Sequence, residues 1–256
     1  MTTTTDIYDH FKPRDYLNYY YNRIDDENRS LLEFFAESYK GVPTDAHMIE
    51  FGGGPTVYQI ISAAKYVKKI DFCDYLQSNI DEIELWKGGS AKAFNWDNFI
   101  RQALDIERHA VNESAVKERS KLVKNSLSEL LQGNAFLTDP CGEEYREKYD
   151  VMGLVFVPEG ITNSKPAWES ALKNILTLIK PGGILVTAAI LGADYWHSGP
   201  QSIPAANLVE ADFNDTFPKL GLSIITKRTI PSEVPDPDDP DFTGYTGMIF
   251  IKAVKT

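Results

Sequence analysis

Apolar and polar residues in the first third of the chain follow the pattern of alternating strands and helices. The compact apolar run at 47–51 (HMIEF) leads directly into three glycines at 52–54. The stretch at 57–69 then repeats apolar residues at helical intervals and ends in lysines, which a helix C-terminus prefers. A second short apolar run, IDFCDY, occupies 70–75. Strand, glycine turn, helix and strand form a βαβ unit, whose strands lie parallel because the helix crosses over between them.

Several further segments have the apolar spacing of helices. The run at 166–180 is amphipathic, begins with Pro166 in its first turn and is followed by Pro-Gly-Gly. The predicted helices are 31–41, 76–88, 166–180 and 205–220, and the stretches 94–112 and 114–131 are predicted as helical or irregular.

Strand-like runs continue through the second half of the chain. YDVMGLVFV is apolar at nearly every position, as expected for a strand buried on both faces. The predicted later strands are 135–139, 149–157, 183–191, 222–230 and 245–254, with a loop at 192–204. The last two runs, joined by a Pro- and Asp-rich loop, indicate an antiparallel ending on an otherwise parallel sheet. We therefore predict an α/β fold in a single domain that covers residues 1–256.

Charge and composition narrow the function classes. The chain has 256 residues and a formal net charge of −11, and its Lys and Arg residues are dispersed. Nucleic-acid binding needs clustered basic residues, so this class is not expected. No apolar run approaches the about 20 residues of a membrane-spanning helix, and the N-terminus lacks the basic and apolar regions of a signal peptide. We expect a soluble, cytoplasmic protein that binds neither nucleic acid nor membrane.

The cysteines and histidines have no metal-ligand spacing. Cys73 and Cys141 form no CxxC pair, and the four histidines form no HxxxH or HExxH pattern. We expect two reduced thiols and no metal site.

The glycine turn at 52–54 is the first candidate for ligand binding. A glycine turn between a strand and a helix lets a ligand approach the backbone and directs the first helical N–H groups toward it. Val57 stands where a dinucleotide GxGxxG would have its third glycine, and no GKS or GKT follows for a P-loop. What remains is the acidic-x-Gly-x-Gly that starts at Glu50, which many class I methyltransferases use against the amino-acid end of S-adenosylmethionine. A strand-turn-helix without a ligand also has this pattern.

Two more motifs support an adenosine-containing cofactor. Asp74 ends the second strand, 22 residues beyond Gly52, where a carboxylate accepts hydrogen bonds from ribose hydroxyls. NAD enzymes share this geometry. LIKPGGILV is a sequence that class I methyltransferases commonly have before their fifth strand. The three motifs in this order favour S-adenosyl-L-methionine as cofactor and a Rossmann-like class I methyltransferase fold.

A longer set of residues resembles one methyltransferase family. Phe11-Lys12-Pro13-Arg14-Asp15-Tyr16-Leu17 with Tyr20-Tyr21 resembles the F-x-P-R-x-Y-L-x-x-Y-Y signature of the nicotinamide, phenylethanolamine and indolethylamine N-methyltransferases, whose family also includes thioether S-methyltransferases. The agreement continues in Gly52-x-Gly54-Pro55-Thr56-x-Tyr58-Gln59, Asp74-Tyr75-x-x-x-Asn79, Phe94-x-Trp96 and Lys180-Pro181-Gly182-Gly183. The landmarks span most of the chain in the family's order.

The resemblance implies roles around the methyl donor. It implies an N-terminal helical lid at 1–42, ahead of a Rossmann-like core at 43–256, with Tyr16 and Tyr21 closing over the donor. Asn134 stands where the family usually has an aspartate that binds the adenine amine, and an asparagine carbonyl can still accept that hydrogen bond. The implied cofactor-binding residues are Tyr16, Tyr21, Gly52, Gly53, Gly54, Thr56, Tyr58, Asp74, Tyr75, Asn79, Asn134 and Ala135.

The acceptor side departs from the family pattern. Nicotinamide-type members carry an acidic residue and a serine just after the fifth strand, where this chain has Ala189 and Ala193, so nicotinamide is not expected as acceptor. Trp and Tyr side chains there would stack on a ring or cage a cationic amine, or would simply pack the lid. The predicted acceptor-binding residues are Tyr20, Glu159, Asp194, Tyr195 and Trp196, and Glu159, Asp194 and His197 are the candidate catalytic bases.

These inferences predict an S-adenosylmethionine-dependent methyltransferase that acts on a small-molecule acceptor and releases S-adenosyl-L-homocysteine. We expect an amine or a heterocyclic nitrogen as acceptor, in bacterial secondary metabolism, and a monomer or weak dimer. An O-, S- or C-methyltransferase of the same fold and a noncatalytic protein that binds adenosyl ligands stay open. An NAD-dependent oxidoreductase is disfavoured by the missing third glycine.

Overall fold

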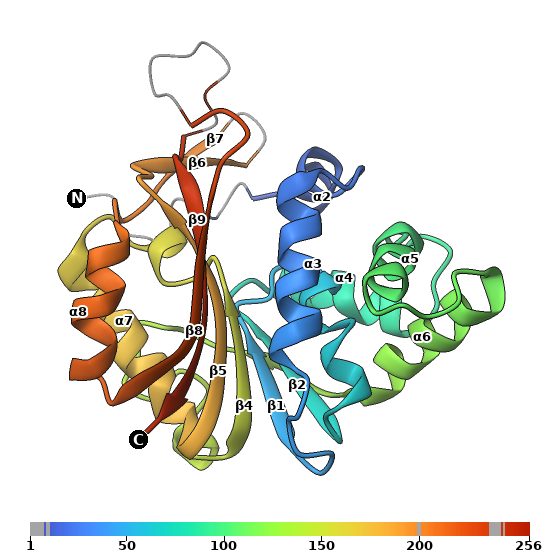
Figure 1. Ribbon diagram of the computed structural model, residues 1–256, viewed down its shortest axis with the longest axis horizontal. Coiled ribbons are helices and arrows are strands. Elements are labelled where there is room, and N and C mark those ends of the chain that lie inside the picture. The colour runs from blue at the N-terminus through green and yellow to red at the C-terminus, as the bar shows by residue number, and fades with distance from the viewer. Residues whose placement is uncertain (1–7, 9–10, 199–200, 236–241, 243) are drawn as a thin grey trace.

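Seven strands form one sheet in the computed structural model, which describes residues 8, 11–198, 201–235, 242 and 244–256. The sheet order is β3-β2-β1-β4-β5-β9-β8 (Figure 1). The first five strands in chain order run parallel, and the last one, β9, is antiparallel to both β5 and β8. The strands are β1 His47–Phe51, β2 Lys69–Asp74, β3 Leu127–Gln132, β4 Tyr149–Val155, β5 Ile179–Leu191, β8 Leu222–Pro231 and β9 Gly247–Lys255. The predicted α/β fold with an antiparallel ending is confirmed.

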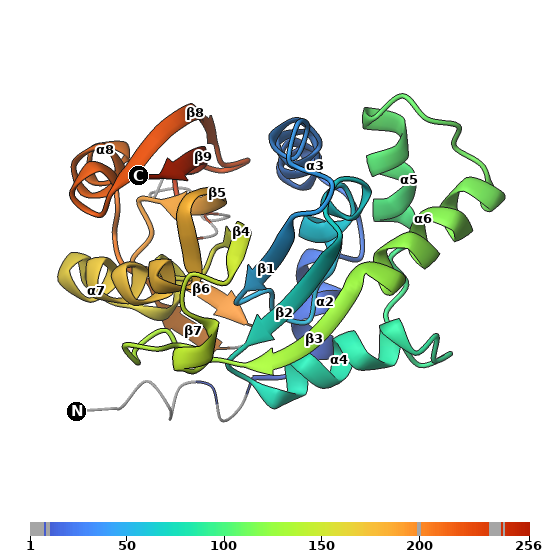
Figure 2. The same cartoon turned by 90° about the horizontal axis from the view of Figure 1, so that it is seen from below.

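Helices cover both faces of the sheet (Figure 2). Neighbouring residues of β1, Met48 and Ile49, belong to two different apolar cores, because successive side chains of a strand point to opposite faces. One core includes residues of α3, α4, α5 and α6, and the other includes residues of α7 and α8. The helices are α2 Pro13–Tyr20, α3 Asp26–Ser38, α4 Gln77–Lys87, α5 Asp97–Ile106, α6 Glu113–Ser126, α7 Lys165–Ile175 and α8 Glu210–Lys219. None of the helices described here is both long and apolar enough to cross a membrane.

The predicted helix at 57–69 is wrong in detail. The chain forms two short 3-10 helices there, Tyr58–Ile60 and Ala63–Lys65. Residues 57–64 are buried throughout, so the segment has no solvent face that would favour a regular amphipathic helix. The side chains of Thr56 and Gln59 both donate to the Gly53 carbonyl oxygen and thereby hold the chain in a tight turn.

The third strand was also misplaced by the sequence pattern. It is β3, which overlaps the end of the stretch 114–131 that was predicted as helical or irregular, whereas residues 135–139 form a turn. β3 is an edge strand and is exposed at several positions, so it lacks the continuous apolar run of a central strand. In the turn that follows, the Asn134 side chain accepts the backbone N–H of Phe136 at 2.9 Å.

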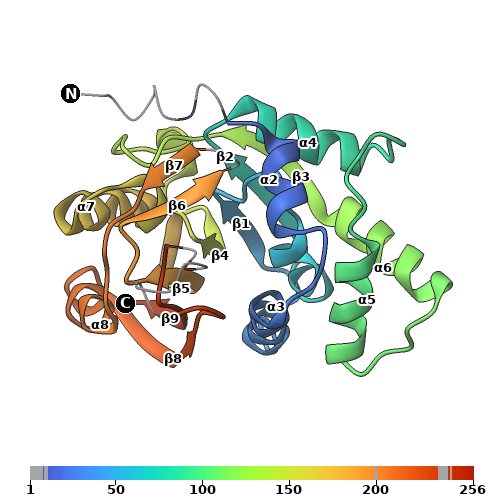
Figure 3. The same cartoon turned by 90° about the horizontal axis from the view of Figure 1, so that it is seen from above.

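A small hairpin replaces the loop predicted at 192–204. Its strands are β6 Tyr195–Ser198 and β7 Gln201–Pro204, which pair antiparallel apart from the main sheet. Viewed from above, α2 and this hairpin lie over the same end of the parallel strands (Figure 3). The two additions therefore cover the edge at which βαβ folds place their ligands.

Candidate active site

A cavity of about 280 Å³ is lined by residues at the carboxyl ends of β1, β2 and β4, together with residues of α2 and the β6–β7 hairpin. Every residue that the sequence predicted to bind the cofactor lines it, from Tyr16 on α2 to Ala135 after β3. Tyr20 and Trp196, predicted for the acceptor, line it as well. Ligands of open α/β sheets bind in the crevice outside the carboxyl ends of the strands, so this cavity is the candidate active site.

The glycine turn after β1 is held in a conformation that requires glycine. Gly52 and Gly54 have φ values of +69° and +61°, which L-residues with a side chain rarely adopt. A Cβ on Gly52 would lie 2.3 Å from Val157 Cγ2. The N–H groups of Gly52 and Gly53 donate to the Cys73 carbonyl at 2.8 and 3.2 Å, which fixes the turn against the end of β2. The turn thus leaves backbone, not side chains, facing the cavity.

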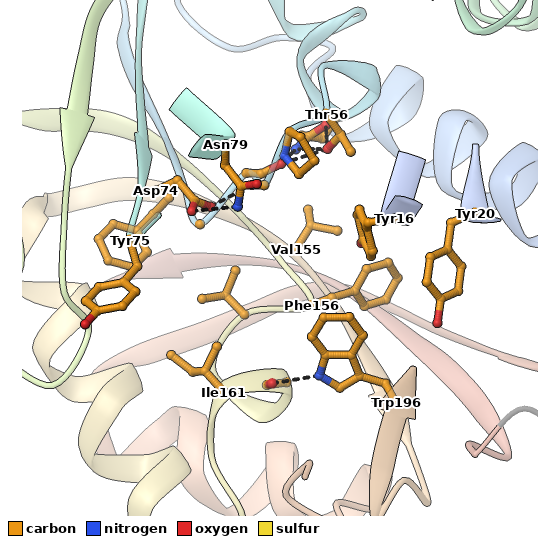
Figure 4. Close-up of a pocket in the computed structure, with 18 of the residues that line it drawn as sticks. Tyr16, Tyr20, Thr56, Asp74, Tyr75, Asn79, Val155, Phe156, Ile161 and Trp196 are labelled. Atoms are coloured by element: carbon orange, nitrogen blue, oxygen red, sulfur yellow. Dashed lines mark hydrogen bonds between the residues drawn. The ribbon is translucent and has the colours of Figure 1, made fainter. Parts of the chain in front are cut away.

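Asp74 at the end of β2 is the most strongly bonded carboxylate of the cavity. One of its oxygens accepts the N–H of Gly54 at 2.8 Å. The other accepts the N–H of Leu76 at 2.8 Å and Nδ2 of Asn79 at 2.9 Å (Figure 4). Burial raises the pKa of Asp74, and these hydrogen bonds oppose the rise. The network holds the carboxylate at a fixed place beside the glycine turn.

Asn79 leaves one buried acceptor unused. Its Oδ1 atom has no hydrogen-bond partner among the described residues, although it is buried and the residue lines the cavity. A buried polar atom without a partner is unfavourable unless a ligand or water satisfies it. Together with the Asp74 carboxylate, it is suited to the hydroxyl groups of a ribose, so these residues fit an adenosyl cofactor.

The loop after β3 forms the next part of the cavity wall. Asn134 and Ala135 line the cavity there, and the Oδ1 atom of Asn134 already accepts one backbone N–H. A carbonyl oxygen has a second lone pair, so this atom can also accept from an adenine amine. Cys73 and Cys141 are free thiols beside this loop, with their sulfur atoms 3.5 Å apart.

Aromatic side chains from the lid and the hairpin close the opposite side. The Tyr16 ring meets the Trp196 ring edge-on with centroids 5.9 Å apart, and its hydroxyl lies 3.4 Å from that of Tyr21. Trp196 Nε1 donates to the Gly160 carbonyl at 2.8 Å (Figure 4), and the Tyr20 hydroxyl donates to the His197 carbonyl at 2.8 Å. Because these contacts join α2 to the hairpin, the lid is part of the site in this conformation.

The sequence profile of the NNMT/PNMT/TEMT family matches residues 1–256. The chain belongs to this family. It is therefore an S-adenosylmethionine-dependent methyltransferase with a Rossmann-like fold.

The chain is similar to human nicotinamide N-methyltransferase, with which it is 29% identical over 215 residues that cover 80% of each protein. Indolethylamine N-methyltransferase of Oryctolagus cuniculus is 26% identical over 223 residues, which cover 84% of this chain and 83% of the relative. Among solved structures, the N-methyltransferase NodS from Bradyrhizobium japonicum, in complex with S-adenosyl-L-homocysteine, superimposes with a TM-score of 0.51. It is 11% identical and covers 93% of this chain and 90% of that one, a likeness that shows the fold alone.

The three candidate bases, and Tyr195 of the predicted acceptor site, lie outside the cavity. Glu159, Asp194, Tyr195 and His197 are not among the described residues that line it. Tyr195 and His197 flank Trp196 on β6, and side chains alternate across a strand, so only Trp196 of the three faces the cavity. Asp194 accepts a hydrogen bond from Asn207 Nδ2 at 2.9 Å. The sequence pattern brought these residues close along the chain but could not assign their faces.

Glu159 is buried beside β5. It is 1% exposed, and one of its carboxylate oxygens accepts the Ile190 N–H at 3.2 Å. Burial raises the pKa of Glu159 from its usual 4.5 to about 8, with the backbone hydrogen bonds opposing the shift. The hydrogen bond from Ile190 joins the loop after β4 to β5, and burial favours the protonated form of Glu159.

The buried state of Glu159 predicts a pH-dependent stability. Folded protein keeps a proton on Glu159 that the unfolded chain releases above pH 4.5, so the stabilisation is full below that pH and is lost as pH rises toward about 8. Glu159→Gln keeps the acceptor oxygen without titrating. We expect its free energy of unfolding, relative to wild type, to rise between pH 5 and pH 8, as measured by urea unfolding at both pH values. Exposed Glu37 offers the control Glu37→Gln, and a pH-independent difference for Glu159→Gln would contradict the prediction.

Several cavity residues were missed by sequence reasoning. A glutamate in the first turn of a helix is a common response to the helix dipole, so Glu27 gave no signal of its own. Phe11 lies in the N-terminal signature but was assigned no role. The missed residues that line the cavity include Tyr8, Phe11, Glu27, Phe156, Tyr245 and Met248. In the described part of the chain, no three His, Cys, Asp or Glu residues are grouped so as to hold a metal ion.

Proposed function

We propose that this protein transfers a methyl group from S-adenosylmethionine to a nitrogen atom of a small amine or heterocycle. The observation that carries the proposal is the division of the cavity into two parts. The glycine turn, Asp74 and Asn79 form a polar part suited to the donor, whereas Tyr20, Trp196 and other aromatic residues form the part left for an acceptor (Figure 4). Aromatic walls bind planar rings and organic cations well.

The protein's part in the chemistry is to position two reactants and exclude water. When bound, S-adenosylmethionine supplies a sulfonium methyl group, which the acceptor nitrogen takes up through its lone pair as the S–C bond breaks and S-adenosylhomocysteine is left. Asp74 and Asn79 would hold the ribose of the donor through the hydrogen-bonding groups described above. Tyr16 and Trp196 meet over the cavity and shield the reacting atoms from solvent.

The acceptor segment supports a substrate other than nicotinamide. Ala189 and Ala193 are both buried and offer neither a carboxylate nor a hydroxyl at the positions where nicotinamide-type members were expected to have them. We place the reaction in bacterial secondary metabolism and in the cytoplasm, in keeping with this altered segment and the acidic composition of the chain.

The proposal is tested first by ligand binding and then by turnover. Calorimetric titration with S-adenosylmethionine, S-adenosylhomocysteine and NAD is expected to detect binding of both adenosyl ligands and none of NAD. Mass spectrometry of reactions with aryl-alkyl amines, isoquinoline, phenols and thioethers is then expected to find methylated product among the amines and the heterocycle. Binding of NAD alone, or methylation confined to oxygen or sulfur, would refute the proposal.

A further inference from the structure

The charges that line the cavity are all negative. Three carboxylates line it, those of Asp25, Glu27 and Asp74, and no Lys, Arg or His occurs among its described lining residues. Asp74 belongs to the donor part, where it accepts three N–H groups and is assigned to the ribose. Asp25 caps α3, since its Oδ1 atom accepts the N–H of Asn28 at 2.8 Å and the Asn28 side chain at 2.9 Å. This leaves Glu27 as the carboxylate whose role in the cavity is unexplained.

Glu27 is held in place from the far end of the chain. The Tyr245 hydroxyl donates to one carboxylate oxygen, and the N–H of Glu233 donates to the other at 3.2 Å. Tyr245 lies just before β9 and also lines the cavity. Two residues distant in sequence thus fix the Glu27 carboxylate at the cavity wall.

The surroundings of Glu27 contain hydrogen-bond donors but no cation. No described Lys, Arg or His forms an ion pair with it. Burial raises the pKa of Glu27, and Asp25 and Glu233 add to the rise, while the hydrogen bonds from Tyr245 and the Glu233 N–H oppose it. A partly buried carboxylate without a cation is unfavourable, and a cationic ligand would remove that penalty.

Aromatic residues that line the same cavity as Glu27 suit the same ligand. Asn28, the next residue, donates from Nδ2 to the Tyr20 carbonyl at 3.3 Å, so the start of α3 is tied to the lid. Tyr20 and Trp196 line the cavity with Glu27. A carboxylate beside aromatic rings binds an ammonium group by charge and by cation–π contact, whereas an acceptor with a carboxylate or phosphate would meet only negative charge.

We infer that Glu27, held by Tyr245, determines acceptor specificity by binding the ammonium group of a cationic aryl-alkyl amine. The inference rests on the proposed function and narrows it from amines and heterocycles to amines that are protonated in solution. The role assigned to Glu27 is recognition of the charge. Before the transfer the ammonium group loses one proton to solvent water, because only the neutral nitrogen has the lone pair that takes up the methyl group.

Binding of two matched probes tests the inference. Protein saturated with S-adenosylhomocysteine is titrated with 2-phenylethylamine and with 2-phenylethanol, which differ mainly in the ammonium group. We expect wild type to bind the amine at least about 10-fold more tightly, as a charge-assisted hydrogen bond provides. Glu27→Gln is expected to lose this preference, Glu27→Asp to keep part of it and Tyr245→Phe to reduce it. Glu37→Gln removes an exposed carboxylate of the same helix and is expected to behave as wild type.

The outcomes separate the inference from the proposed function. If wild type binds S-adenosylhomocysteine but prefers neither probe, or if folded Glu27→Gln keeps the preference, the inference is overturned and the proposed function stands. If wild type binds no adenosyl ligand, both are overturned. Should Glu27→Gln fail to fold, Glu27→Asp and Tyr245→Phe decide, and an unchanged preference in both overturns the inference. For an amine that is turned over, Glu27→Gln is expected to raise KM about 10-fold or more with kcat within a few-fold.

Discussion

Asp74→Ala is expected to weaken binding of S-adenosylmethionine about 100-fold or more, because two hydrogen bonds to a charged carboxylate are lost. The effect extends beyond the ligand. Asp74 also accepts three N–H groups, from Gly54, Leu76 and Asn79, and alanine would leave them without that acceptor. The glycine turn and the start of α4 would lose the group that joins them. Calorimetric titration of wild type and variant measures the change.

A control variant on α4 shows whether weaker binding comes from the loss of Asp74 itself or from the loss of any carboxylate in this region. Asp81 is an exposed carboxylate of α4, and Asp81→Ala is expected to bind the donor as wild type does. Asp74→Asn keeps the side-chain shape but turns an N–H₂ group toward at least one N–H group that Asp74 accepts. This variant is therefore expected to bind S-adenosylmethionine weakly as well. A folded Asp74→Ala protein with wild-type affinity would exclude the assigned donor site.

Gly52→Ala is expected to lower the free energy of unfolding by about 2–5 kcal/mol and to abolish donor binding. About 1–2 kcal/mol of this comes from placing a Cβ at positive φ, and the rest from overlap with Val157 in a packed interior. The turn cannot relax easily, since its N–H groups are bonded to the end of β2. Urea unfolding measures the stability, and calorimetry measures the donor affinity.

The two causes can be separated within this chain. Gly41 has a similar φ of +79°, and a Cβ added there would meet no atom within 4 Å, so Gly41→Ala is expected to cost only the backbone part, about 1–2 kcal/mol. Shortening Val157 in the Gly52→Ala/Val157→Ala double variant is expected to recover part of the overlap penalty. Equal losses for Gly41→Ala and Gly52→Ala would show that the contact with Val157 is unimportant.

The donor half of the site was predictable because its residues are local in sequence. The turn at 52–54 follows β1 directly, and Asp74 ends the next strand, so chain order alone places them together at one edge of a parallel sheet. The hydrophobic pattern did not predict β3, because an edge strand needs no continuous apolar run. It also wrongly predicted a regular helix at 57–69, because this segment is buried over most of its length.

The acceptor half was not predictable because it is made by tertiary packing. Glu27 and Tyr245 are 218 positions apart and meet only when α3 packs beside β9. On β6 the reason is different. Trp196 faces the cavity and its neighbours do not, and a strand of four residues inside an expected loop gave no alternation from which to assign faces. Which carboxylate faces the acceptor therefore needed the fold.

The antiparallel ending of the sheet has a consequence for how such an enzyme diversifies. We assign the donor to the ends of β1, β2 and β3, and the acceptor to a wall made by α2, the start of α3, the β6–β7 hairpin and Tyr245, two residues before β9 (Figure 1). Mutations in these peripheral segments leave the glycine turn and its hydrogen bonds intact. On this assignment, natural selection or laboratory evolution would exchange one acceptor for another by changing these segments, while the glycine turn and Asp74 stay the same.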